Sequence, residues 1–282
     1  MNISTANSSS VSDLNAQGTS IVTASCAINL ILSVPTNGYV LWLIATGAGG
    51  RMASDFFSLN LALSEILVCL SSVFFIVSTH VKTTAVFVLV TFGISLLYIG
   101  RPLFQSCVCV ERYLAVVHPV VFLKYKPLRY RVGCCGVAWL MVLGDCLFGV
   151  LLCGTSIYNY AYSGQNLILM FLMLFCCLSV LRALKQPGPG EGDREREGTN
   201  NRKMRAFKII LIILVSVSVS YLPVIVIMSL SDVLNVVALY FSHSIALSIT
   251  VITGFVQPLL FLHRSEKLPC IGPGEGDRER RR

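Results

Sequence analysis

The sequence predicts an all-α membrane protein, a bundle of seven transmembrane helices. Hydrophobic residues make up 55% of the 282 residues and charged residues only 13%, and the mean hydropathy is +0.74. A water-soluble domain of this length needs far fewer apolar residues. They also gather in segments close to the roughly 20 residues that cross a bilayer. Each segment has to be helical, because lipid offers the backbone no hydrogen-bond partners.

The seven predicted spans follow one another along most of the chain. They lie near residues 21–46, 55–78, 85–117, 132–153, 166–184, 206–230 and 236–262. Residues 1–20 form an N-terminal tail, and residues 263–282 form a C-terminal tail. The fifth span is the shortest, and the third is long enough to tilt.

The basic residues predict the orientation of the bundle. Of 22 Lys and Arg, Arg101 lies inside the third span and Lys82 in the loop after the second. The others lie at or near the loops after spans one, three and five, or in the C-terminal tail. The positive-inside rule makes that side cytoplasmic and the N-terminus extracellular. The net charge of +8 then reflects topology and attraction to anionic lipid, without a nucleic-acid partner.

Three positions are candidates for covalent modification. Asn2 and Asn7 begin N-x-Ser sequons in the extracellular tail and are predicted glycosylation sites. Cys270, just past span seven, is either a palmitoylation site or an ordinary free thiol. The other ten cysteines fall in the spans, where cysteine serves as a small packing residue. Span one is expected to act as an uncleaved signal anchor.

Residues 187–201 are too rich in Pro, Gly and charge to pack, so we expect a flexible cytoplasmic linker. The segment GPGEGDRER occurs at 188–196 and again at 272–280. We have no functional account of this duplication. A basic stretch, 202–208, then opens span six as a topology anchor or a contact for a cytoplasmic partner.

Charges inside the membrane are costly unless they are paired. Glu65 in span two and Arg101 in span three lie at similar depth, so we expect an ion pair, with Gln257 of span seven as a third member. This pair has either a purely structural role or a switching role. Asp145 in span four is either a second partner for Arg101 or protonated.

Prolines interrupt four of the spans. They are Pro35, Pro102, Pro223 and Pro258. Each removes a helical hydrogen bond and permits a kink, either as packing variation or as a hinge.

Six short motifs occur in order, one for each of six spans. They are Asn37 in span one, Leu59-Asn60-Leu61-Ala62-Leu63-Ser64-Glu65 in span two, Glu111-Arg112-Tyr113 with the later Pro119 in span three, Trp139 in span four, Ser220-Tyr221-Leu222-Pro223 in span six and Gln257-Pro258-Leu259-Leu260-Phe261 in span seven. In this order they resemble the motifs of rhodopsin-like (class A) G-protein-coupled receptors over roughly residues 20–270. The His118-Pro119 pair and the loop at 123–127 resemble the branch with nucleotide, protease-activated and lipid receptors.

The resemblance implies a plasma-membrane receptor that responds to an unknown extracellular ligand. In such receptors Arg112 would be held by Glu111 and released when span six swings outward, pivoting at Tyr221 and Pro223. Arg112 would then contact the C-terminal helix of a Gα subunit, and Val120 would dock on Gα as an apolar knob. The resemblance also allows a receptor dimer, and it implies no cofactor and no metal.

The sequence departs from the family pattern in three places. Phe87 stands where the family has a cysteine that is tied to the second outer loop. Arg101 stands where a small polar residue helps to hold a sodium ion, so its guanidinium would supply that charge itself. Phe261 lacks the hydroxyl of the family's tyrosine.

The ligand class is open. Ile94 stands where amine receptors carry an aspartate, so a biogenic amine is not expected. The outer halves of spans six and seven carry no Lys or Arg, which argues against a phosphate clamp. The remaining outer candidates are His80, Lys82, Tyr158, Tyr160, Tyr162, His243 and Ser244.

Three other functions agree less well with the sequence. No catalytic or metal-ligand spacing is present, so an enzyme is not expected. A transporter would show two matching halves, which seven spans do not provide. The degraded motifs also allow a receptor-like protein that no longer signals and acts as a dimer partner or scaffold.

Overall fold

The structure is a computed structural model of the chain. It describes the backbone of residues 3–46, 56–125, 127–152, 154–185 and 193–264, and the side chains of residues 13–46, 56–125, 127–152, 154–183, 211–256 and 258–262. This part of the chain is helical apart from short turns and loops. Its elements are α1 (Ile3–Ala45), α2 (Phe56–Ser78), α3 (Thr84–Ser95), η2 (Leu96–Gly100), α4 (Arg101–Val117), α5 (Pro119–Tyr125), α6 (Leu128–Leu152), α7 (Ser156–Lys185), α8 (Asp193–Ser229), α9 (Val236–Ile252), η3 (Thr253–Phe255) and α10 (Val256–Arg264).

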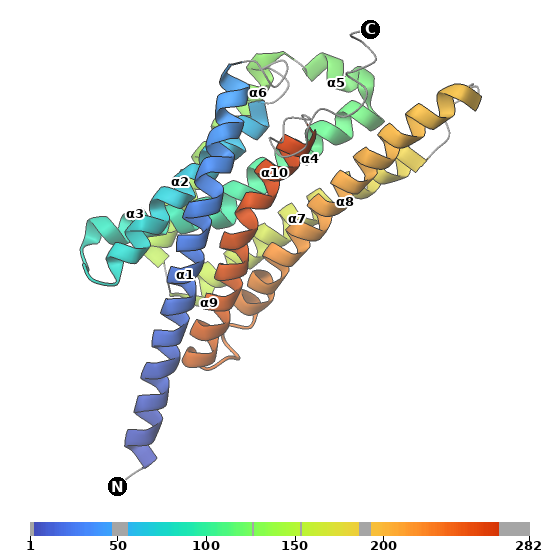
Figure 1. Ribbon diagram of the computed structural model, residues 1–282. Helices are drawn as coiled ribbons and strands as arrows, with labels where there is room; N and C mark the ends of the chain where they lie inside the picture. The colour runs from blue at the N-terminus through green and yellow to red at the C-terminus, as the bar shows by residue number, and fades with distance from the viewer. Residues whose placement is uncertain (1–2, 47–55, 126, 153, 186–192, 265–282) are drawn as a thin grey trace.

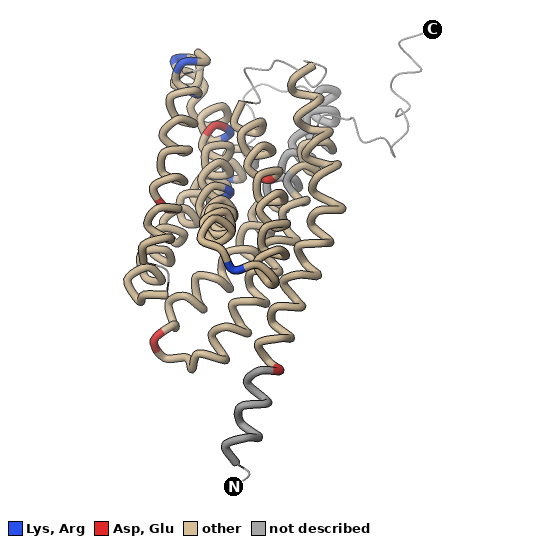
Figure 2. Tube along the Cα trace, turned by 90° about the vertical axis from the view of Figure 1, so that its left-hand side faces the viewer, with Lys and Arg blue, Asp and Glu red and all other residues tan. Residues whose placement is uncertain are grey.

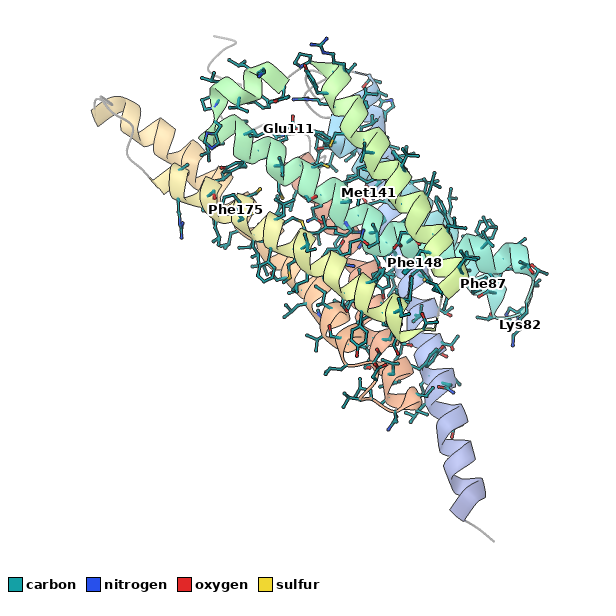
Figure 3. All side chains as sticks on the ribbon, turned by 180° about the vertical axis from the view of Figure 1, so that it is seen from behind. Lys82, Phe87, Glu111, Met141, Phe148 and Phe175 are labelled. Atoms are coloured by element: carbon teal, nitrogen blue, oxygen red, sulfur yellow. The ribbon has the colours of Figure 1, made fainter. Side chains whose placement is uncertain are left out.

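Seven stretches of the described residues are long and apolar enough to cross a membrane, which confirms the predicted fold class. Spans one to seven are Asp13–Ala45, Phe56–Ser78, Thr84–Val117, Leu128–Leu152, Ser156–Ala183, Leu211–Ser229 and Val236–Leu262. Side chains such as Phe87, Met141 and Phe175 are exposed on the outside of the bundle (Figure 3). Charged residues are few along its length (Figure 2). An apolar exterior of this kind suits lipid rather than water.

Several predicted boundaries differ from the observed helices. The predicted N-terminal tail is helical from Ile3, because α1 continues beyond the membrane-length segment. Part of the expected flexible linker, from Asp193 onward, is also helical and belongs to α8. Its Glu and Arg residues favour helix, which composition alone did not reveal. Residues 186–192 lie outside the described chain.

The fifth span is longer than predicted. It begins at Ser156, not near 166, so Tyr158, Tyr160 and Tyr162 lie on α7 and not in a loop. Polar residues lowered the apparent hydrophobicity of this first part of α7. Tyr162 and Asn166 are buried against neighbouring helices, which makes a helix possible there.

The third span is the centre of the bundle. Its last part, α4, packs against α2, α6 and α7, while α1 packs against α2 and α9 (Figure 1). Phe104 of α4 lies in a core cluster with Met173 of α7 and Tyr221 of α8. A second cluster surrounds Leu96–Ile99 of η2. Side chains on the third span therefore reach most of the other spans.

Two spans are irregular at the middle of the bundle. In span three, η2 is a π-helical turn that ends at Gly100, directly before Arg101. In span seven, η3 is a 3₁₀ turn that contains Gly254. Such departures from α-helix free backbone groups and are frequent at functional sites.

The short helix α5 marks one end of the bundle. It follows α4 and precedes α6, at the same end of the bundle as the end of α10, whereas α1 begins at the opposite end (Figure 1). We call these the α5 end and the opposite end.

Candidate functional site

A buried ion pair joins spans two and three. Arg101 Nη2 donates to Glu65 Oε2 at 2.7 Å, and Arg101 Nε donates to the second oxygen, Oε1. Glu65 is 0% and Arg101 3% exposed. The predicted pair is therefore present, and its two-pronged geometry suits a guanidinium facing a carboxylate.

Span seven supplies a second partner of Arg101, besides Glu65. Arg101 Nη1 donates to the backbone carbonyl of Thr250. Gly254 leaves the room for this contact, since a Cβ there would lie 2.6 Å from Arg101 Nη2 and 2.8 Å from Glu65 Oε2. The predicted third member, Gln257, has a side chain outside the described residues. Backbone groups freed by a local irregularity leave no mark in the sequence, which is why Thr250 was missed.

The ion pair continues into span six through hydroxyl groups. Thr253 Oγ1 donates to the Thr250 carbonyl at 2.9 Å, and Ser220 Oγ donates to Thr253 Oγ1 at 2.7 Å. Thr250 Oγ1 donates to the Ser220 carbonyl at 2.9 Å. Ser220 precedes the buried Tyr221, and Pro223 follows inside α8. One polar network thus runs from Glu65 to the proline-containing part of span six.

The other predicted residues of the membrane interior lie outside this network. Asn37 is buried, but its side chain donates to Ser33 O within α1 at 2.9 Å. Pro258 is buried in α10, and Phe261 packs against the cluster that joins α1 to α2. Within the described chain Asp145 is not paired with Arg101, so that alternative was wrong; its Oδ2 is buried without a hydrogen-bond partner.

A second ion pair lies at the α5 end. Glu111 Oε1 is 2.6 Å from Nη2 of Arg131, which lies in the first turn of α6. Their side chains are only 7% and 5% exposed. From its sequence context alone, Arg131 is one of many basic residues that set the topology. Arg112 and Tyr113 follow Glu111 on the last turns of α4 (Figure 3).

The helix α5 presents an apolar residue at the surface. Val120, which follows Pro119, is 80% exposed. Tyr113 OH and His118 Nε2 lie 3.1 Å apart and connect the end of α4 to the start of α5. Val120 and Arg112 therefore belong to the same end of the bundle.

A polar and aromatic group lies toward the opposite end. Tyr98 OH is 3.2 Å from His243 Nε2, and the ring of Tyr98 meets that of Tyr162 edge to face, with centroids 5.3 Å apart. Tyr162 in turn packs against Tyr158. Three of the outer ligand candidates, Tyr158, Tyr162 and His243, are thus brought together around Tyr98.

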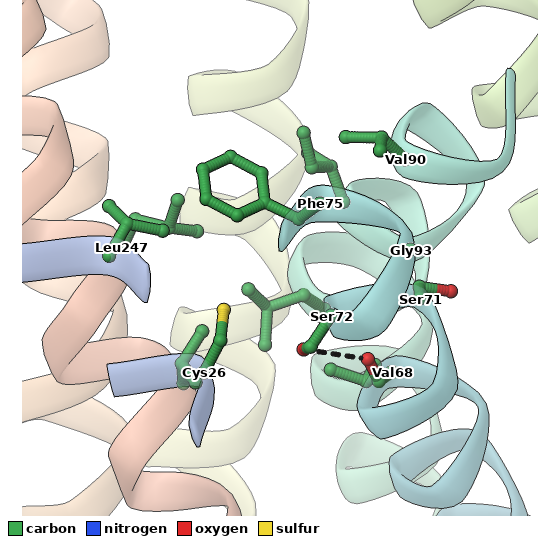
Figure 4. Close-up of a pocket in the computed structure, with 12 residues that line it drawn as sticks. Cys26, Val68, Ser71, Ser72, Phe75, Val90, Gly93 and Leu247 are labelled. Carbon is green, nitrogen blue, oxygen red and sulfur yellow. Dashed lines mark hydrogen bonds between the residues drawn. The ribbon is translucent and has the colours of Figure 1, made fainter. Parts of the chain in front are cut away.

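A small cavity lies between spans one, two, three and seven (Figure 4). Its volume is about 40 Å³, and its lining, which includes Cys26, Phe75 and Leu247, is mostly apolar. Ser72 on its wall already donates to Val68 O at 2.9 Å. A cavity of this size holds water-sized molecules, not a receptor ligand. Among the described residues no group of three or more His, Cys, Asp or Glu side chains could hold a metal ion.

The profile of the seven-transmembrane receptor (rhodopsin family) matches residues 36–166, from span one into span five. Over these residues the chain is similar to the rhodopsin family of seven-transmembrane receptors. This match confirms the predicted resemblance to that family.

Individual receptors are similar over shorter stretches. The chain is 28% identical over 120 residues to a purinoceptor of Gallus gallus, covering 40% of this chain and 33% of the relative. It is 32% identical over 129 residues to proteinase-activated receptor 4 of Homo sapiens, covering 44% and 33%. It is 27% identical over 164 residues to Mas-related G-protein coupled receptor member A1 of Mus musculus, covering 54% and 53%. The match thus spans about a third to a half of these relatives' length.

Proposed function

We propose that this rhodopsin-family receptor transmits an extracellular signal to a heterotrimeric G protein at its α5 end. Its partners would be an extracellular ligand and the C-terminal helix of a Gα subunit. Glu111, Arg112, Tyr113, Pro119 and Val120 would form the coupling surface. The receptor would act in the plasma membrane, with the α5 end in the cytoplasm and the N-terminus outside.

The exposure of Val120 carries this proposal. Val120 is 80% exposed and lies on a helix outside the seven spans. Its side chain is therefore stabilised neither by packing within the bundle nor by the lipid around the spans. Burying such a side chain in a partner would contribute about 1.5–3 kcal/mol. Arg112 on α4 supplies a permanent charge whose planar fork can bond backbone carbonyls of the same partner.

Two further observations support an activation route through span six. The network from Glu65 through Arg101 to Ser220 ends next to Tyr221 and Pro223, the proposed pivot. Proline removes one backbone hydrogen bond of α8, so the helix can bend there. A ligand that moves span seven would therefore change the hydrogen bonds of span six.

Ligand-free signalling in transfected cells tests the proposal. Wild type and Arg112→Ala are compared at matched surface expression with a panel of Gα biosensors. We expect a basal signal in at least one Gα channel that Arg112→Ala abolishes and Val120→Asp weakens. Equal signals from wild type and Arg112→Ala in a channel above mock-transfected cells would contradict the proposed coupling surface.

A receptor-like protein that no longer signals, acting as a dimer partner or scaffold, is the second candidate. The observation that favours it is the tie of Arg101 to Glu65 and to span seven, which resists relative motion of the spans. This candidate predicts no basal signal in any channel, and it predicts that Arg101→Ser creates none.

A further inference from the structure

The placement of α5 depends on few contacts. This helix has seven residues, and none of them is buried. A helix this short is unstable in isolation, because only a few backbone hydrogen bonds offset the cost of nucleating it. Side chains that reach it from the seven spans must therefore hold it in position.

Three such contacts reach α5. Tyr113 of α4 approaches His118 just before the helix, and Tyr125 meets Tyr130 of α6 edge to face, with ring centroids 5.3 Å apart. The third is the guanidinium of Arg131, whose Cζ lies 5.9 Å from the ring centroid of Phe122. Arg131 is 4% exposed, whereas Tyr125 and Tyr130 are exposed. It is the buried anchor among the three.

Arg131 also contacts the predicted switch. Its Nη2 lies 2.6 Å from Glu111 Oε1, and Glu111 immediately precedes Arg112. Arg131 therefore contacts Glu111 and also lies within the distance of about 6 Å at which an aromatic ring attracts a cation.

We propose that Arg131 is a positioning residue for G-protein coupling, which links Glu111 at the end of span three to the α5 helix that presents Val120. A change in the contacts of Glu111 would reach α5 through this one side chain. The inference rests on the proposed function, because α5 matters here as the surface that meets Gα.

Hydrogen exchange at α5 tests the placement without any signalling assay. We would measure amide exchange by mass spectrometry in peptides covering 119–125 of the purified receptor. The test variants are Arg131→Gln and Phe122→Leu; the second removes the ring and leaves the ion pair intact. The matched control is Arg182→Gln, which removes an exposed guanidinium from α7.

We expect roughly five- to ten-fold faster exchange at α5 in both test variants and no change in Arg182→Gln. Unchanged exchange at α5 in Phe122→Leu would overturn the placement. Peptides from the middle of α6 report global unfolding. If the Arg131→Gln variant unfolds globally, the exchange at α5 in Phe122→Leu alone decides whether the placement holds.

The Gα biosensors test the functional half separately. In a channel where wild type signals, Arg131→Gln and Phe122→Leu should lower the signal several-fold although Arg112 is present. Signals equal to wild type despite faster α5 exchange would overturn the link to coupling. If wild type itself is silent in every channel, the proposed function fails while the exchange result still decides the placement of α5.

Discussion

Gly254 lies so close to Arg101 that a Cβ at this position would be 2.6 Å from the guanidinium Nη2. Real Cβ atoms do not approach that closely, so span seven can receive the ion pair only because position 254 has no side chain. The absence of a side chain at position 254 also leaves room for the carboxylate of Glu65, whose Oε2 would lie 2.8 Å from a Cβ there.

Gly254→Ala is therefore expected to displace Arg101 or Glu65. Overpacking at a filled site costs about 1–3 kcal/mol, so the thermal midpoint of the detergent-solubilised receptor should fall. A thiol-reactive fluorophore can follow unfolding through the buried cysteines. Gly144→Ala in α6 is the control, because its Cβ would meet nothing within 4 Å. Equal midpoints for the two variants would show that the close approach does not constrain the bundle.

Arg101→Ser is expected to cost more stability than Gly254→Ala. Removing one partner of a buried ion pair costs about 3–5 kcal/mol, because the other charge is left unpaired. Joint replacement, Glu65→Gln with Arg101→Ser, should recover part of the loss. A double-mutant cycle on the thermal midpoint measures the coupling, and additive losses would exclude it.

The tethered guanidinium should also make the receptor indifferent to sodium. The carboxylate of Glu65 is already paired with the guanidinium of Arg101. A sodium ion would therefore find no unpaired carboxylate to bind at this site. We expect the same wild-type midpoint in sodium chloride and in choline chloride at equal ionic strength. A wild-type midpoint that rises with sodium would refute this account of Arg101.

Trp139→Phe is expected to destabilise the contact between spans two and four. The indole Nε1 donates to Asn60 Oδ1 at 3.0 Å, and the ring also packs against Phe104. Phenylalanine keeps the aromatic packing but leaves Asn60 without this donor, at a cost of about 1–3 kcal/mol. Trp42→Phe is the control, because Trp42 is 56% exposed. A smaller loss for Trp139→Phe than for Trp42→Phe would contradict this role.

Asp232 ties the loop before span seven to the start of span five. Ser156 Oγ and Tyr160 OH donate to its two oxygens at 2.7 and 2.8 Å, and these hydrogen bonds lower the pKa of Asp232. A lowered pKa means that the contribution to stability is full at neutral pH. It is lost only as the pH falls from about 4, the ordinary value for aspartate, through the lowered value.

The effect of Asp232→Asn should accordingly be the same at pH 6 and pH 8. We expect a small fall in the thermal midpoint at both, since exposed contacts contribute little. A fall in the thermal midpoint that is confined to pH 6 would mean that the carboxylate of Asp232 titrates near neutrality. Its pKa would then be raised and not lowered.

The sequence was sufficient to predict seven helices and the Glu65–Arg101 pair, because both follow from the cost of polar groups in lipid. It could not predict that the Thr250 carbonyl binds Arg101 or that Gly254 makes room for the ion pair, because both depend on a 3₁₀ turn. It also misplaced the start of span five, where Tyr162 and Asn166 look like loop residues until neighbouring helices bury them. Nor could it single out Arg131, because this residue is one of many basic residues whose positions are explained by the membrane topology.

The π-helical turn Leu96–Gly100 changes how the outer part of span three is indexed. A π turn absorbs one extra residue, and each residue of an α-helix corresponds to about 100° of rotation. Counting back from Arg112 therefore stops one residue short beyond the turn, so that Gly93 takes the angular place assigned to Ile94. Gly93 faces Ser71 so closely that a Cβ would lie 2.2 Å from that of Ser71. Span two thus covers position 93, where no side chain could supply the acid that a cationic ligand would need.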